Sequence, residues 1–381
     1  MQRYIDFIER INYYKTNKRI IIWGAGLNGR QIHRLLSLHE INVEYFVDTR
    51  HDEDRVFPPD RLLSENKQEF LVVVSPHHIP YILDIDEKLE KWGWQKGENY
   101  INFVTDDVIE ANRELTYFDP FLGFSQIRDI EGFQIYGVEE KGKRIIVLGN
   151  CTSVPNKLSK IWVDYLSQSN QAATFTIYNG ACAGYSSSQE LLKLIRDVLI
   201  LNPDILIVFN GVIDATNANR QPGYPYYTKY EYNLLEQCFD DKAIKYKNMQ
   251  EVPNKILYGI KNEETNYAHY IRNMRIIHTL AEEMDIKFFA FLQPSLYCNT
   301  YGLSHSEKEI FKAFYKENEP TSTFSIAHIF YKNVQQSLSG EYWFHDMSNV
   351  FKDTQDGTYL DEIHYTNTGH QLIADYICSF L

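Results

Sequence analysis

The sequence lacks the features that mark membrane, secreted or nucleic-acid-binding proteins. No apolar run reaches the about 18–20 residues of a membrane span, and the longest candidate, residues 197–211, is broken by Asn202, Pro203 and Asp204. Positive charge is in deficit, because the 381 residues carry a net charge of −13. This argues against non-specific binding to nucleic acid or anionic membranes. The first residues, MQRYIDFIERIN, carry charges throughout, unlike a signal peptide. We therefore expect a cytoplasmic protein with no nucleic-acid partner.

Cysteine is scarce and scattered. The chain has 5 cysteines and no C-x-x-C pair; they are Cys151, Cys182, Cys238, Cys298 and Cys378. An odd number of widely spaced cysteines favours reduced thiols over a disulfide framework or a zinc site. We therefore expect no metal, and a reduced thiol stays usable as a nucleophile.

The sequence does contain a regular alternation of apolar, strand-like runs and helix-like runs. Such alternation predicts parallel sheets covered by helices. A first series has strands at 18–23, 42–48, 69–75 and 99–103, with helices at 30–38 and 82–94. A second series has strands at 144–149, 174–179, 204–211 and 286–294, with helices at 158–166, 188–199, 270–284 and 368–377. We expect an α/β domain over residues 1–110, an extended linker over 111–142 and a second, doubly wound α/β domain over 143–381.

A glycine motif lies between the first predicted strand and its helix. Gly24, Gly26 and Gly29 have G-x-G-x-x-G spacing, and Asp48 ends the next strand. Glycines let the backbone approach a phosphate, the helix N-terminus attracts an anion, and an acid at this distance can bond a ribose hydroxyl. These four residues are therefore candidates to bind a nucleotide or nucleotide-sugar. The alternative is a turn that needs its glycines for packing alone. The region is too short to favour dehydrogenase chemistry.

Residues 18–104 also resemble the small Rossmann-like domain at the front of bacterial sugar acetyltransferases. The resemblance implies a module that binds a nucleotide-sugar or docks onto a partner.

Short polar motifs follow the predicted strands of the second series, where open α/β sheets place their sites. They are LGNCTS (148–153), NGACAG (179–184), FNGVID (209–214) and FLQP (291–294), and YLDEIH (359–364) precedes the last helix. Their order resembles the SGNH, or GDSL, hydrolase family, in particular members from bacterial surface-polysaccharide gene clusters. The resemblance implies a flavodoxin-like α/β/α fold. It also implies an acyl-ester hydrolase or acyltransferase that acts on a glycan or nucleotide-sugar and needs no cofactor for catalysis.

The same resemblance assigns a catalytic triad. The nucleophile position, a serine in the family, falls on Cys151, and the Asp-x-x-His pair falls on Asp361 and His364. A thiol beside an imidazole is a workable nucleophile, and the acid would orient the imidazole. Ser153, two residues after Cys151, is a less favoured nucleophile because a hydroxyl there usually caps a helix.

The oxyanion-stabilising half of the site is altered. The resemblance assigns backbone N–H donors to Cys151 and Gly184, but the family's asparagine donor falls on Ile213. Losing one such donor slows a comparable reaction by roughly 10²–10³. Asn210 is a possible substitute donor. The alternative function is therefore a catalytically degenerate domain that binds a glycan precursor or a partner protein.

One further segment invites a functional interpretation. Residues 215–267 contain eight tyrosines, whose rings would suit a lid that stacks on sugars. A packed aromatic subdomain or a partner surface is the alternative.

Overall fold

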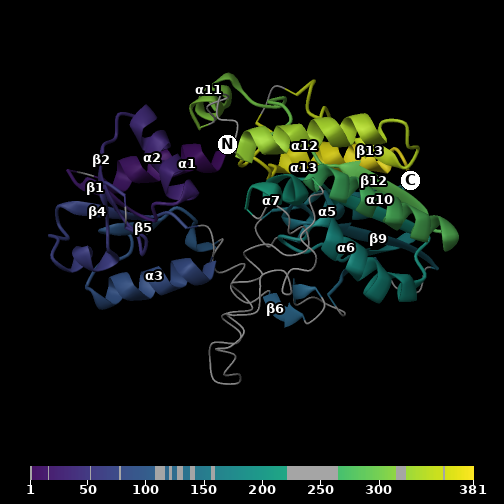
Figure 1. The fold of residues 1–381 in the computed structure, drawn as a ribbon, viewed down its shortest axis with the longest axis horizontal. Helices are drawn as coiled ribbons and strands as arrows, with labels where there is room; N and C mark the ends of the chain where they lie inside the picture. Colours follow the sequence, from purple (N-terminus) through teal and green to yellow (C-terminus); the bar gives the residue numbers. More distant parts are fainter. Residues whose placement is uncertain are drawn as a thin grey trace. The chain divides into compact units, whose positions relative to one another are not determined.

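The computed structural model describes residues 2–15, 17–51, 53–76, 79–107, 116–119, 122–126, 132–137, 142–155, 159–220, 265–314, 323–354 and 357–381. The chain divides into two compact units (Figure 1). Unit 1 comprises Met1–Arg113 and Ser304–Lys316, and unit 2 comprises Glu114–Leu303 and Glu317–Leu381. The predicted tyrosine-rich lid lies largely outside the described residues, as does Cys238.

Unit 1 is built around a five-stranded, all-parallel sheet. In spatial order its strands are β3 (Val56–Phe57), β2 (Val43–Val47), β1 (Arg19–Trp23), β4 (Phe70–Val74) and β5 (Tyr100–Asn102). The sheet is covered by α1 (Gln2–Tyr14), α2 (Leu27–Leu38) and α3 (Ile79–Lys91). All five residues of β4 are buried, because helices cover both faces of the sheet. The strand order reverses direction between β1 and β4, and ligands of open α/β sheets bind at such a switch point.

A helix from far along the chain completes unit 1. This helix, α11 (His305–Phe314), packs against α2. No local feature of residues 305–314 predicts this partner, since an amphipathic helix fits any apolar surface.

Unit 2 contains a six-stranded sheet. In spatial order its strands are β13 (Phe344–Asp346), β12 (Lys287–Leu292), β11 (Ile205–Asn210), β9 (Lys143–Gly149), β10 (Phe175–Asn179) and β8 (Gln134–Tyr136). The edge strand β8 is antiparallel to β10, and the other pairings are parallel. A separate hairpin joins β6 (Thr116–Asp119) and β7 (Gly123–Gln126). The order of the parallel strands is flavodoxin-like, so the predicted α/β fold class is confirmed.

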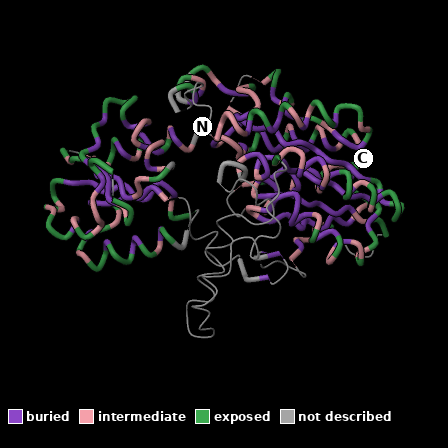
Figure 2. Tube along the Cα trace, in the orientation of Figure 1, coloured by how far each residue is buried: buried purple, intermediate pink, exposed green. Residues whose placement is uncertain are grey.

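Two groups of helices flank this sheet. One pairs α5 (Trp162–Ser167) with α13 (Asn367–Cys378), and the other contains α6 (Ser187–Lys193), α7 (Val212–Arg220), α10 (Asn266–Glu283) and α12 (Thr323–Leu338). Figure 2 shows buried strands inside exposed helical surfaces in each unit. None of the described helices is long and apolar enough to cross a membrane.

Candidate active site

The turn after β9 presents Cys151. A Cβ atom added to Gly149 would lie 2.7 Å from the carbonyl oxygen of Phe209, so only glycine lets the turn pack this tightly against β11. The next residue, Asn150, caps the short 3₁₀ turn Cys151–Ser153: its Oδ1 accepts hydrogen bonds from Thr152 N–H (3.3 Å) and Thr152 Oγ1 (3.0 Å). The cap holds Cys151 in place at the carboxyl end of the strand, with its side chain only partly buried.

The loop before α13 presents Asp361 and His364 to the same edge. The imidazole Nδ1 lies 2.8 Å from Asp361 Oδ2 and 2.9 Å from Oδ1, and Oδ1 also accepts the His364 backbone N–H at 2.8 Å. Because a carboxylate only accepts, Nδ1 carries the proton and Nε2 is left to exchange one with a reacting group. Asp361 is buried, whereas 33% of the His364 side-chain surface stays accessible, enough for a substrate to reach it.

The electrostatics of His364 suit a thiol partner. Burial acts to lower the pKa of the imidazole, but the Asp361 carboxylate and the hydrogen-bonded Cys151 side chain more than offset this and hold that pKa well above its ordinary value. A hydrogen bond thus links the imidazole to the Cys151 side chain. The structure thus brings the three predicted triad residues together, while their catalytic roles stay a prediction.

Two backbone N–H groups near Cys151 can donate hydrogen bonds to a ligand. Gly184 has φ 87°, in the left-handed region that favours glycine, in the turn after β10. Within the described parts of the chain, the N–H groups of Cys151 and Gly184 donate to no other group. The loop is anchored by Asp214, whose carboxylate accepts Ser187 Oγ–H at 2.6 Å and Ser187 N–H at 3.0 Å. The third predicted donor position, Ile213, offers only hydrocarbon.

The structure disfavours two alternatives that the sequence left open. The Asn210 side chain is buried and bonded to Glu190 and Tyr270, so it is not available as an oxyanion donor. Ser153 is fully buried, and its Oγ accepts the Trp162 indole N–H at 2.9 Å. A substrate cannot reach that hydroxyl without unfolding the turn.

In unit 1, packing explains two of the three glycines of the glycine motif but not the third. Gly24 has φ 107°, and an added Cβ would lie 2.4 Å from Ser75 Oγ. An added Cβ on Gly29 would lie 1.8 Å from the carbonyl oxygen of Gly24. Packing alone therefore requires these two glycines. A Cβ on Gly26 would meet nothing within 4 Å, so packing does not explain this third glycine.

The predicted ribose-binding acid has a partner within the protein. Asp48 Oδ2 accepts the Ala25 N–H at 2.7 Å, and Oδ1 accepts the Arg50 N–H at 3.0 Å. The carboxylate therefore braces the glycine loop. Helix α2 starts next to this loop with no side-chain cap on its N-terminus.

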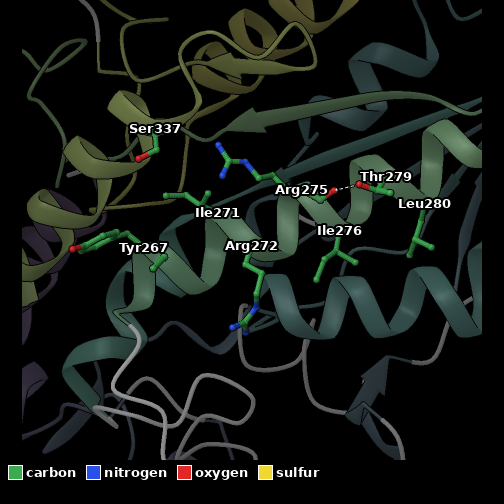
Figure 3. Close-up of a pocket in the computed structure, with 9 residues that line it drawn as sticks. Tyr267, Ile271, Arg272, Arg275, Ile276, Thr279, Leu280 and Ser337 are labelled. Carbon is green, nitrogen blue, oxygen red and sulfur yellow. Dashed lines mark hydrogen bonds between the residues drawn. The ribbon is translucent and has the colours of Figure 1, made fainter.

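Two other features of the described residues bear on a possible site. No group of three or more possible metal ligands occurs among the described residues. A groove of about 610 Å³ runs along α10 (Figure 3), and none of the predicted site residues lines it. Its lining includes Tyr267, Ile271, Arg272, Arg275, Leu280 and Ser337.

Sequence reasoning missed one residue of the site. Gln293 follows β12 in the FLQP motif, and its side chain hydrogen-bonds residues of three of the segments described above. The available signal was a polar residue directly after an apolar strand. That signal indicates a position at the carboxyl edge but not the contacts made there.

Unit 2 is thus a flavodoxin-like α/β domain with polar side chains gathered at the carboxyl edge of its sheet. A family model for the GDSL-like lipase/acylhydrolases matches residues 136–377, so the chain belongs to that family. Among solved structures, it is similar to an acetylxylan esterase from Geobacillus stearothermophilus, with 13% identity and a TM-score of 0.36, covering 62% of this chain and 93% of that one. It is also similar to a second acetyl xylan esterase, with 13% identity and a TM-score of 0.36, covering 62% and 99%. No curated protein sequence matches it.

Proposed function

We propose that Cys151, His364 and Asp361 form a catalytic triad that hydrolyses or transfers an acyl ester group. The observation that carries this proposal is the hydrogen-bonded chain from Asp361 through His364 to Cys151. Each member has the chemistry its position needs: a partly exposed thiol, an accessible imidazole and a buried carboxylate.

The reaction proceeds through a thioester. The Cys151 thiolate attacks the ester carbonyl, and the carbonyl electron pair moves to the oxygen, which the N–H groups of Cys151 and Gly184 bind. Collapse of this intermediate expels the alkoxide, which His364 protonates through Nε2. Water, or an acceptor hydroxyl or amine, then attacks the thioester while His364 removes its proton. The acid or acylated acceptor leaves and the thiolate returns.

A glycan or nucleotide-sugar is the proposed acyl carrier, in the synthesis of a bacterial polysaccharide. Support comes from the resemblance of the motifs to polysaccharide-cluster members of the family. It also comes from the glycine loop of unit 1, for which we propose a bound nucleotide or nucleotide-sugar. The open space beside Gly26 and the uncapped N-terminus of α2 suit a phosphate there. The carboxylate of Asp48 would support the loop from behind.

A non-catalytic binding module is the second candidate. Ile213 favours it, because hydrocarbon replaces an oxyanion donor whose loss slows such reactions by roughly 10²–10³. In that case the same edge of the sheet would hold a glycan precursor without cleaving it.

Thiol reactivity separates the two candidates. The rate at which iodoacetamide alkylates Cys151 is measured against pH by peptide mass spectrometry, in wild type and in His364→Ala. The triad predicts fast alkylation below pH 7 that is lost in His364→Ala but kept in His51→Ala, which changes an exposed histidine. Free cysteine titrates at about pH 8.5. If Cys151 titrates there in all three proteins, the triad is refuted.

A further inference from the structure

Gln293 occupies a central and fully buried position in unit 2. It directly follows β12, has no accessible surface and continues the strand ladder by donating its N–H to the carbonyl of Asn210 at 2.9 Å. Its own carbonyl accepts the Tyr331 hydroxyl at 3.1 Å. The backbone of Gln293 is therefore held by hydrogen bonds on both its N–H and its carbonyl. These bonds fix the position from which the side chain extends.

The side-chain amide of Gln293 reaches three different segments. Its Oε1 accepts the Asn150 side-chain N–H at 2.6 Å and the Val212 backbone N–H at 3.4 Å. Its Nε2 donates to the Thr152 hydroxyl at 3.4 Å and to the Tyr365 hydroxyl at 3.5 Å.

Asn150, Thr152 and Tyr365 lie beside residues of the proposed reaction, and Val212 lies beside the position where the family resemblance places an oxyanion donor. Asn150 and Thr152 flank Cys151 in sequence, Val212 precedes Ile213, and Tyr365 follows His364.

The surroundings determine which end of the amide is oxygen. Asn150 Oδ1 accepts the Thr152 N–H, so the amide nitrogen of Asn150 faces Gln293. The Val212 N–H also faces it, and two donors require an acceptor. At the other end, the Tyr365 hydroxyl donates to the Pro294 carbonyl at 2.6 Å and so presents an oxygen lone pair to Gln293. A buried amide satisfied in this way holds one orientation.

We propose that Gln293 is a positioning residue: its buried amide holds the Cys151 turn, the start of α7 and the His364 loop in the arrangement in which the thiol meets the imidazole. This inference rests on the proposed function, since the arrangement matters only if Cys151 and His364 react together. Gln293 itself touches neither reacting atom. Its effect reaches them through Asn150 and Tyr365, which are their neighbours in the chain.

The same geometry accounts for the asparagine at position 150. A carboxylate there would put an acceptor 2.6 Å from the acceptor oxygen of Gln293. Rotating the Gln293 amide would relieve that clash, but its NH₂ group would then face the Val212 N–H. Asparagine at position 150 is therefore matched to Gln293 in hydrogen-bonding terms.

The test uses Gln293→Met, which keeps the length of the side chain and removes its hydrogen bonds. Cys151 alkylation is followed against pH in this variant, alongside wild type and His364→Ala, and melting temperatures are recorded. We expect the pH midpoint to rise toward that of free cysteine, with alkylation at pH 6.5 falling about tenfold per unit of the rise. Adding His364→Ala to Gln293→Met should then change little, because both act on one arrangement.

The control is Tyr331→Phe, which removes a hydrogen bond to the backbone of the same residue and leaves its side chain untouched. It should lower the melting temperature without moving the midpoint. If Gln293→Met does not fold, Tyr365→Phe removes one of the four contacts and should shift the midpoint in the same direction by less. The groups that face His364, which are Asp361, Cys151 and His370, are unchanged in all these variants.

The outcomes separate this inference from the function on which it rests. A low, His364-dependent midpoint in wild type that stays in place in Gln293→Met, or in Tyr365→Phe if that variant is the one that folds, would overturn the role of Gln293 and keep the triad. A wild-type midpoint equal to that of free cysteine would overturn both. A shift in the Gln293 or Tyr365 variant that Tyr331→Phe does not show supports the inference.

Discussion

The α-carbon of Gly29 packs directly against the carbonyl oxygen of Gly24, so a methyl group there would lie 1.8 Å from that oxygen. We therefore expect Gly29→Ala to lower the free energy of unfolding of unit 1. Overpacked sites typically lose about 1–3 kcal/mol, and this loss should be at least as large. Gly26→Ala should cost less than about 1 kcal/mol, as expected for a change at a helix N-cap. Urea unfolding followed by tryptophan fluorescence measures both. Equal losses would show that the loop packs differently.

Because packing does not explain Gly26, the same variant tests the nucleotide proposal. Isothermal titration with uridine diphosphate and with adenosine diphosphate should show binding of at least one to wild type, weakened tenfold or more by Gly26→Ala. The matched control is Gly340→Ala in unit 2, where an added Cβ also meets nothing within 4 Å. No binding of either nucleotide to wild type, or equal binding to Gly26→Ala, would contradict a phosphate site at this loop.

Position 213 gives a direct test of the oxyanion arrangement. Ile213→Asn supplies an amide where the family resemblance places one, and we expect hydrolysis of an activated ester such as p-nitrophenyl acetate to accelerate. A single donor in a comparable site contributes roughly 10²–10³ in rate, which sets the upper limit. The gain should appear in kcat and not in KM, because the new bond forms in the transition state. Ile213→Leu should leave the rate unchanged.

Two results of the Ile213 experiment would argue for the binding module. One is an ester hydrolysis rate in Ile213→Asn that equals the wild-type rate. The other is a hydrolysis rate, in wild type or in Ile213→Asn, that does not fall when Cys151→Ala is added.

The fold could be predicted where a local sequence pattern determines the local structure. The apolar runs of the sequence form the strands β1, β4, β9 and β11, and most of their residues are buried. Motif order placed Cys151 at the carboxyl edge of the sheet because parallel strands share that edge, and the family resemblance assigned Asp361 and His364 to the same site. The contacts of Gln293 and the partner of α11 depend on which distant segments meet, and no spacing within either segment encodes that. Asn210 illustrates the same limit, because its orientation depends on Glu190 and Tyr270.

His370 should make the stability of the protein sensitive to acid. Its Nδ1 accepts the backbone N–H of Trp162 at 3.2 Å. Burial, assisted by the nearby His364 charge, lowers the pKa of His370 to about 3. The ordinary histidine pKa is about 6.5, so between these values the unfolded chain binds a proton that the folded chain excludes. Stability should therefore be complete above the ordinary pKa and fall by up to about 1.4 kcal/mol for each pH unit on the way down to the folded pKa.

His370→Asn isolates this contribution, because its Oδ1 can still accept the Trp162 N–H while the titrating group is gone. The free energy of unfolding, measured in urea from pH 7.5 to pH 4, should fall less steeply in this variant than in wild type, and the two curves should converge or cross as the pH falls. His51→Asn, which changes an exposed histidine, should follow the wild-type slope. Parallel curves for wild type and His370→Asn would mean that His370 takes up its proton in the folded protein. The Trp162 N–H would then have to find another acceptor at low pH, because a doubly protonated imidazole has no lone pair to offer.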